Sequence, residues 1–351
     1  MARLPPTTTA KQRDTLAATP GPAPRDSVSI SAVAAHAGVS IATVSRVVNG
    51  VANKASAATV ARVQAAIASL GYRPTGAGRA LRSGQSRLVA VLAANMANPT
   101  MPAIVAAAEV ALRGAGSVMV LCDTHEQPEL QDEYLLEMRS HYARGLVLLG
   151  AVDSPVLRSF VLAGEPLVFV NRRSPVDGAG QRYVGIDNLT AGAEVARWIA
   201  AHGSGAVGLI HARLSSSATA DRVTGFRAGL KACGIALPAV RIQTVAGAEH
   251  LQIGYQAMRR LMTQAKPARV VFCTSDLIAY GAHRCALEAG LQIGRDLVLI
   301  GFDDSPMNAW VAPWLHAVRV PYAAYGEAIV TALADTTPRA IILPHELVIR
   351  A

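Results

Sequence analysis

Residues 38–49 have the sequence Gly-Val-Ser-Ile-Ala-Thr-Val-Ser-Arg-Val-Val-Asn, which predicts a tight turn followed by a short amphipathic helix. Ser40 stands at the N-cap position of this helix, where a hydroxyl satisfies a free backbone N–H group. Thr43, Ser45 and Arg46 add hydrogen-bonding groups along the helix, and such groups suit phosphates and base edges. The stretch therefore predicts the second helix of a helix-turn-helix.

The residues on either side complete a small three-helix domain. Ser29 precedes an apolar-periodic stretch that ends at Gly38, and Ser56 precedes a longer one that ends at Leu70 and Gly71. Serine before a periodic stretch and glycine after it are start and stop signals of helices. The sequence therefore predicts one helix before the turn and a third helix after it.

Positive charge is concentrated in this quarter of the chain. Residues 1–87 contain eleven Lys or Arg and only two acids, whereas residues 88–351 contain twenty-two of each sign. Residues 28–87 contain no acid at all. A basic region joined to a neutral remainder is typical of nucleic-acid binding, and a solvated basic face without a partner is the alternative.

The composition excludes several other classes of protein. The chain has 351 residues, enough for two or three domains, and its 51% hydrophobic residues can fill large cores. Its four cysteines lie far apart, which argues against a disulfide scaffold and fits a reduced, cytoplasmic compartment. The chain contains neither an apolar stretch of membrane-spanning length nor a secretory signal. Residues 1–27 are rich in Pro, Thr and Ala and predict a disordered arm.

From Leu88 onward, apolar runs of strand length alternate with stretches of helix length. The runs lie at 88–93, 117–122, 146–149, 167–170, 207–210, 241–245, 270–273 and 297–300. Continuous apolar strands between helices indicate buried parallel sheets, so the fold class is α/β with two doubly wound subdomains, interrupted near residues 172–190. A ligand is then expected in the cleft outside the carboxyl ends of the strands.

The segment from Val28 to Gly84 resembles the DNA-binding headpiece of the lactose/galactose repressor (LacI/GalR) family. The matching motifs, after the turn and helix of 38–49, are Leu70-Gly-Tyr-Arg-Pro74 and Arg79-Ala-Leu-Arg-Ser-Gly84. The rest of the chain resembles the periplasmic-binding-protein-like core of the same family. Its motifs are Asn98-Pro99, Gly185-Ile-Asp-Asn188, Asp221-Arg-Val-Thr-Gly-Phe226, Ser275-Asp276 and Gly301-Phe-Asp-Asp304.

The resemblance implies a boundary for each part of the chain. The helix-turn-helix domain covers 28–74, a hinge helix or linker covers 75–87, and the core covers 88–351. Within the core, the N-subdomain comprises 88–185 with 318–335, and the C-subdomain comprises 186–317 with 336–351.

The family also implies roles for residues of the headpiece. Base contacts in the major groove would fall to Ile41, Ala42 and Arg46, because the fork of an arginine matches guanine O6 and N7. Phosphates would be bound by hydroxyls and an amide, namely Ser29, Ser40, Thr43, Ser45, Asn49, Ser56 and Thr59. Helix capping alone would also account for Ser29, Ser40 and Ser56.

Leu81 would be the hinge residue that inserts into the minor groove and kinks the operator, and packing between two hinge helices is the alternative. Gly76 and Gly78 stand where relatives usually carry alanine. Each glycine disfavours a helix by about 0.8–1 kcal/mol, so we expect the hinge helix to form only on DNA.

For the effector, the resemblance points to side chains at the ends of strands and starts of helices. They are Thr100, Met101, Asn171, Arg222, Glu249, Ser275, Asp276 and Asp303. A carboxylate and an arginine fork hold polyols and sugar acids well, which favours Asp303 and Arg222. The plainer alternatives are a turn residue for Asp303, a surface salt bridge for Arg222 and loop chemistry for Asn171.

These observations predict a transcription regulator, most simply a repressor, that binds a palindromic operator as a homodimer and responds to a sugar or sugar acid. The chain ends at Leu347-Val-Ile-Arg-Ala351 without the leucine-heptad helix of tetrameric relatives, so we expect a dimer. A solute-binding protein of the periplasmic type and an α/β enzyme on the same core are the alternatives. The sequence shows no cofactor motif, metal-ligand spacing or nucleophile motif in its proper context.

Overall fold

The computed structural model describes residues 28–50, 55–72, 86–177, 181–202, 205–247 and 249–350. The chain divides into two units, Met1–Gly78 and Arg79–Ala351, and each is described by itself. The expected arm at 1–27 lies outside the described residues, as do Leu81, Gly76 and Gly78 of the expected hinge.

The first unit contains three helices, α1 (Ile30–Ala37), α2 (Ile41–Val48) and α3 (Ala57–Leu70). They confirm the predicted helix-turn-helix. Gly38 ends α1 at φ 63°, a left-handed conformation that glycine adopts without strain. A small apolar cluster holds the three helices together, with Val33 from α1, Val44 from α2 and Val63 from α3 fully buried.

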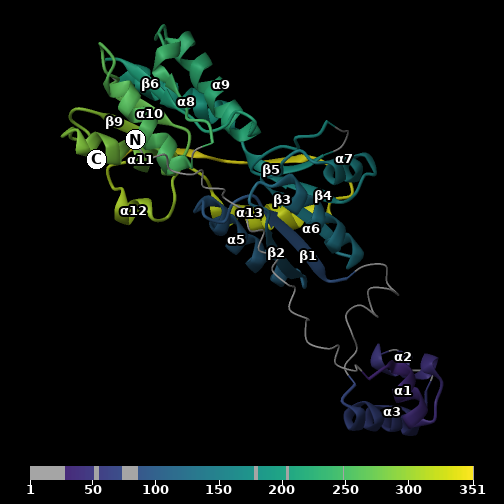
Figure 1. Cartoon of the computed structure of the whole chain (residues 1–351). Helices are drawn as coiled ribbons and strands as arrows, with labels where there is room; N and C mark the ends of the chain where they lie inside the picture. Colours follow the sequence, from purple (N-terminus) through teal and green to yellow (C-terminus); the bar gives the residue numbers. More distant parts are fainter. Residues whose placement is uncertain are drawn as a thin grey trace, which may run out of the picture. The chain divides into compact units, whose positions relative to one another are not determined.

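The N-subdomain of the second unit is a six-stranded parallel sheet (Figure 1). Its strands are β1 (Leu88–Ala93), β2 (Val118–Asp123), β3 (Gly145–Leu149), β4 (Leu167–Val170), β5 (Arg182–Ile186) and β11 (Ala340–Leu343), in the order β11-β5-β4-β3-β1-β2. Helices α5 (Thr100–Gly114) and α13 (Tyr322–Ala334) pack with Val89 and Val91 on one face. Helices α6 (Pro128–Ser140) and α7 (Pro155–Leu162) pack with Ala90 and Leu92 on the other.

The C-subdomain repeats this architecture. Its strands are β6 (Val207–Ile210), β7 (Ile242–Gln243), β8 (Val270–Cys273), β9 (Val298–Asp303), β10 (His316–Arg319) and β12 (Glu346–Val348), in the order β12-β10-β9-β8-β6-β7. All pair in parallel except β12, which runs antiparallel to β10. Helices α8 (Asn188–His202) and α9 (Ser217–Ala232) cover one face, whereas α10 (His250–Met262) and α11 (Asp276–Glu288) cover the other. The short helices are η2 (Ala239–Arg241) and α12 (Asn308–Val311).

The expected α/β class with two doubly wound subdomains is confirmed, but the chain's last strands differ from expectation. β11 pairs with β5 in the N-subdomain, although residues 336–351 were all expected in the C-subdomain. β10 pairs with β9, so residues 318 and 319 belong to the C-subdomain. The chain thus crosses between the subdomains three times, and two adjacent short strands join different sheets, which periodicity cannot reveal.

Close backbone contact fixes α9 against α8. A Cβ atom on Gly225 would lie 1.9 Å from the carbonyl oxygen of Leu189, so only glycine fits at this crossing. Gly225 lies one turn after Arg222, and the tight packing therefore sets where that side chain enters the cleft.

Within the described ranges, no single helix is long and apolar enough to cross a membrane. Helices α1 and α2 meet the length and composition criteria only as a pair, and a bend of 106° separates them.

Candidate functional site

Helix α2 turns one side into the headpiece and the other toward solvent. Val44 is fully buried, whereas Ile41 is 52% exposed, and Ala42 and Arg46 are exposed as well. Arg46 donates from Nε to the carbonyl oxygen of Ala42 at 3.2 Å. This local bond leaves the terminal nitrogens of the guanidinium at the surface, so the three residues expected to read bases lie on the exposed side of one helix.

Three of the expected phosphate-binding serines are helix caps. Ser29, Ser40 and Ser56 each accept a hydrogen bond from the backbone N–H three residues on, at 3.2, 3.2 and 3.3 Å. The hydroxyls of Thr43 and Thr59 lie 2.9 Å from those of Ser40 and Ser56. The three serines are therefore helix caps, which is compatible with a second role. Phosphate contact remains a prediction for these exposed helix N-termini, which favour anions.

Asn49 lies at the opposite end of α2. Its side-chain amide donates to the carbonyl oxygen of Ser45 at 2.6 Å and to the Ser45 hydroxyl at 3.3 Å. Both residues help to end the helix, and their expected contacts with phosphates remain a prediction as well.

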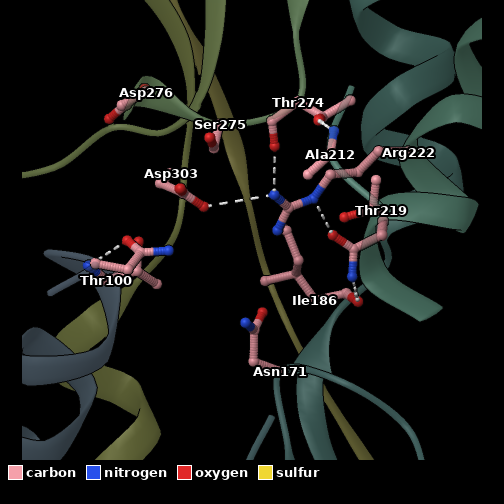
Figure 2. Close-up of polar contacts among 12 residues, drawn as sticks. Thr100, Asn171, Ile186, Ala212, Thr219, Arg222, Thr274, Ser275, Asp276 and Asp303 are labelled. Atoms are coloured by element: carbon pink, nitrogen blue, oxygen red, sulfur yellow. Dashed lines mark hydrogen bonds and ion pairs between the residues drawn. The ribbon is translucent and has the colours of Figure 1, made fainter. Parts of the chain in front are cut away.

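In the core, Arg222 is buried, and its guanidinium lies among residues at the carboxyl ends of strands (Figure 2). Its guanidinium donates to Asn188 Oδ1 and to the carbonyl oxygen of Thr274, both at 2.8 Å. Asp303 Oδ1 lies 3.5 Å from Nη1, and the guanidinium carbon lies 3.5 Å above the ring of Phe302. Only 5% of Arg222 is exposed, so the alternative of a surface salt bridge is wrong.

Asp303 ends β9 with φ 107°, a strained conformation for a residue other than glycine. Its carbonyl oxygen accepts from Tyr322 Oη at 2.9 Å and from Val320 N–H at 3.1 Å, which holds that turn in place. Burial raises the pKa of its carboxyl group to about 6, although Arg222, Thr100 and the N–H of Asp276 favour ionisation. Asp303 is thus a buried acceptor poised at the carboxyl end of a strand.

Several other expected effector residues lie around this pair. Thr100 begins α5 and Ser275 caps α11, both buried at the carboxyl ends of strands. Asn171 follows β4 with φ 65°, and Figure 2 shows its amide directed toward the same space as Arg222. The Ser275 hydroxyl also lies 3.1 Å from His250 Nδ1.

The remaining three expected effector residues have other side-chain surroundings. Asp276 points away from Arg222 (Figure 2), and its Oδ2 accepts from Ser305 N–H and Asn308 Nδ2 at 2.8 and 2.9 Å. Its role in the structure is to hold the loop after β9. Met101 is buried in an apolar cluster that includes residues of both subdomains, and Glu249 is an exposed N-cap residue of α10.

Sequence reasoning missed the groups that orient Arg222. Asn188 begins α8 directly after β5; the motif 185–188 contains it, but no role was assigned to it because β5 itself was not predicted. Tyr322 holds the backbone of Asp303 from a helix far along the chain. Among the described residues, no three His, Cys, Asp or Glu side chains come together as a metal site.

An ion-pair cluster at the same edge of the sheets was also missed. Glu126, in the loop after β2, pairs with Arg172 at 2.7 Å and with Arg213 of the C-subdomain. Arg173 pairs with Asp221 of α9. Both Glu126–Arg213 and Arg173–Asp221 therefore join the two subdomains.

Comparison with known proteins gives a consistent result. The family description "Periplasmic binding proteins and sugar binding domain of LacI family" matches residues 85–305, and "Bacterial regulatory proteins, lacI family" matches residues 29–75. The chain is 29% identical to the HTH-type transcriptional repressor PurR of Yersinia enterocolitica over 87% of this chain and 89% of that protein.

Two solved structures extend the similarity to the fold. The transcriptional regulator CelR in complex with cellobiose is 28% identical with a TM-score of 0.68, covering 92% of this chain and 99% of that chain. A LacI-family regulator from Silicibacter pomeroyi is 25% identical with a TM-score of 0.74, covering 92% and 98%.

Proposed function

This chain belongs to the LacI family of bacterial regulatory proteins, and from that premise we propose that it is a repressor whose affinity for a palindromic operator is set by a small polar effector. As a member of the family it is a DNA-binding transcriptional regulator and not an enzyme. The headpiece match also argues against the alternative of a solute-binding protein without a regulatory role. A DNA partner implies a cytoplasmic location.

The observation that carries the proposal is the exposed side of α2. Arg46 sits there with its position fixed by Ala42, next to the exposed side chain of Ile41. A helix with an arginine fork and small apolar neighbours can enter a major groove and distinguish bases. The capped N-termini of α1, α2 and α3 then suit the flanking phosphates.

The effector site is the cleft around Arg222 and Asp303, with Thr100, Asn171 and Ser275 beside them. The oriented guanidinium donates hydrogen bonds to hydroxyl oxygens, and the buried carboxylate accepts hydrogen bonds from hydroxyl groups. A sugar or sugar acid is the effector class that fits, and cellobiose in the related CelR is of this kind. Met101, Glu249 and Asp276 have structural surroundings that make them weaker candidates for ligand contact.

Regulation would operate through the cleft. The three chain crossings between the subdomains act as hinges, and ligand binding between the sheets shifts the balance of open and closed forms. The shift equals the difference in ligand affinity for the two forms, typically about 1–3 kcal/mol.

We place a homodimer on the operator because a palindromic site requires two headpieces. Val110 on α5 and Val118 and Leu121 on the edge strand β2 are exposed apolar side chains that a second copy would cover. Light scattering is expected to show a dimer, and a stable monomer or tetramer would contradict this part of the proposal.

The test of DNA reading compares Arg46→Ala with Arg62→Ala, which removes the same charge from the exposed side of α3. The operator is first selected from random DNA with the wild-type protein. Arg46→Ala should weaken binding to that operator by about 1–3 kcal/mol and change binding to random DNA little. Arg62→Ala should keep the preference for operator. Equal losses of Arg46→Ala on both DNAs would show that Arg46 contacts phosphate.

A further inference from the structure

One carboxylate lies between two arginines from different subdomains. Glu126 Oε1 is 2.7 Å from Arg172 Nη2, and its Oε2 pairs with Arg213. Glu126 and its neighbour His125 adopt left-handed backbone conformations, with φ 57° and 49°. The loop after β2 is thus bent so that its carboxylate lies between the two subdomains, at some conformational cost.

The side chain of Arg172 is largely buried. Arg172 follows β4, its side chain is 18% exposed, and burial lowers the pKa of its guanidinium to about 10. A Cβ atom on Gly150, at the end of β3, would lie 3.6 Å from Arg172 Cζ. The guanidinium therefore extends across the carboxyl end of the N-subdomain sheet, where ligands bind in such folds.

Three arginines lie close enough to act on one partly buried histidine beside these groups. Burial, together with Arg172, Arg222 and Arg213, lowers the pKa of His250 to about 4, against an opposing effect of Glu249. His250 is therefore neutral at physiological pH, and the three arginines that act on it face the cleft carboxylates Glu126 and Asp303. An anion that enters here would be attracted by these arginines.

We propose that the effector carries a carboxylate or phosphate group that displaces Glu126 from Arg172 and Arg213, while its hydroxyl groups bind Arg222 and Asp303. This inference rests on the proposed function and narrows its effector class to anionic sugars. Both arginine forks suit oxyanions, and a ligand anion held between them joins the two subdomains as Glu126 does in the free protein. The Arg173–Asp221 pair, also between subdomains, is left intact by the exchange.

Because the ligand anion takes the place of Glu126, closure of the two subdomains around the ligand depends on the charge of the ligand. In the free protein Glu126 is the chain's own substitute for the ligand anion, so the arginine pair stays neutralised. A neutral sugar carries no charge to replace that of Glu126, so it competes poorly with Glu126 for Arg172. An anionic sugar competes with Glu126 and frees the strained loop after β2.

The experiment uses the full chain and inorganic phosphate as probe, titrated calorimetrically at fixed ionic strength. Glu126→Gln removes the negative charge that pairs with Arg172 and Arg213, and the variant should bind phosphate at least tenfold more tightly than the wild type. Adding Arg172→Gln to that variant should abolish the gain. Asp221→Asn is the matched control, because it breaks the other ion pair between the subdomains and should not increase phosphate affinity.

A second arm distinguishes the two anions with D-gluconate, D-glucose 6-phosphate and neutral D-glucose. Glu126→Gln should strengthen binding of one or both anions relative to glucose. The proposal fails if Glu126→Gln binds phosphate no better than the wild type, or if the gain survives Arg172→Gln. Operator binding is measured on the same preparations: its absence would refute the repressor assignment, whereas a normal operator titration without a phosphate gain refutes only the anion subsite.

Discussion

The surface of α2 and the floor of the cleft place functional side chains in opposite ways. On α2, Ile41 and Arg46 project into solvent, and a single bond to the neighbouring turn positions the arginine. In the core, Arg222 and Asp303 are each 5% exposed, and partners from α8, from β9 and from the residue after β8 hold them. The first arrangement is local, and the second depends on packing between elements far apart in the sequence.

On α2, the functional side chains contribute little to stability, whereas the functional side chains of the core also stabilise the fold. Truncating an exposed side chain with only a local partner rarely changes stability by more than about 0.5 kcal/mol. Removing one member of a buried ion pair leaves an uncompensated charge and a cavity. DNA recognition should therefore be mutable at little expense to the fold, whereas effector recognition should not.

The largest expected effect is on stability of the core. Arg222→Ala leaves Asp303 without its cation and opens a hole beside Phe302, and it should reduce the free energy of unfolding by about 3–5 kcal/mol. Arg46→Ala should change it by less than about 0.5 kcal/mol. Urea unfolding followed by circular dichroism measures both. Similar losses for the two variants would remove the contrast between the regions.

An intermediate effect is expected where α9 crosses α8. Gly225→Ala would place a methyl group 1.9 Å from the carbonyl oxygen of Leu189, and the resulting shift should destabilise the core by about 1–3 kcal/mol. Because Arg222 lies one turn away, effector affinity should fall as well. Gly114→Ala, which meets no atom within 4 Å, is the control and should leave both quantities unchanged or slightly improve stability. If Gly225→Ala has the stability and effector affinity of the wild type, then α8 and α9 move apart at no measurable expense.

The smallest effect is a pH dependence of effector binding, measured with the best ligand from a thermal-shift screen of sugars and sugar acids. Burial raises the pKa of Asp303 to about 6, and hydroxyl groups donate to its ionised form. Affinity should therefore weaken about tenfold, or about 1.4 kcal/mol, between pH 7 and pH 5. Asp303→Asn should bind more weakly with a flat profile. A flat wild-type profile would show that Asp303 is not the acceptor.

The same group affects stability with a definite sign. Its pKa in the folded protein exceeds the ordinary value of 3.8, so the folded state binds more protons between these two values. The contribution of Asp303 to the free energy of unfolding is thus full below pH 3.8 and is lost as the pH rises through about 6. Such a trend is expected only in the core, because residues 28–72 contain no carboxylate side chain.

The sequence was most informative where structure is local. Ser29, Ser40 and Ser56 predicted all three helix starts of the headpiece, because capping is decided within four residues. Eight strands of the two sheets were predicted from their continuous apolar runs, whereas β10, β11 and β12 were not. β5 was missed, because it begins with Arg182 and contains Gly185, and the sheet that receives β11 depends on tertiary pairing alone.

The site divides in the same way. Arg222, Asp303 and Thr100, selected by motif position, lie close together in the structure, and their contact with an effector stays a prediction. Motif position did not reveal that Asp276, beside Ser275, turns toward Asn308 instead of the cleft. Contacts between distant segments, such as Glu126 with Arg213, leave no local pattern in the sequence and appear only in the fold.

The most direct test of the account is an operator titration by fluorescence anisotropy, with and without effector, on the wild type, Arg46→Ala and Asp303→Asn. Arg46→Ala should lose operator affinity by about 1–3 kcal/mol while its calorimetric affinity for effector stays unchanged. Asp303→Asn should bind operator as the wild type does without effector and should no longer respond when effector is added. If Asp303→Asn weakens operator binding as much as Arg46→Ala does, or still responds fully to effector, then the separation of a surface that reads DNA from a cleft that senses effector is contradicted.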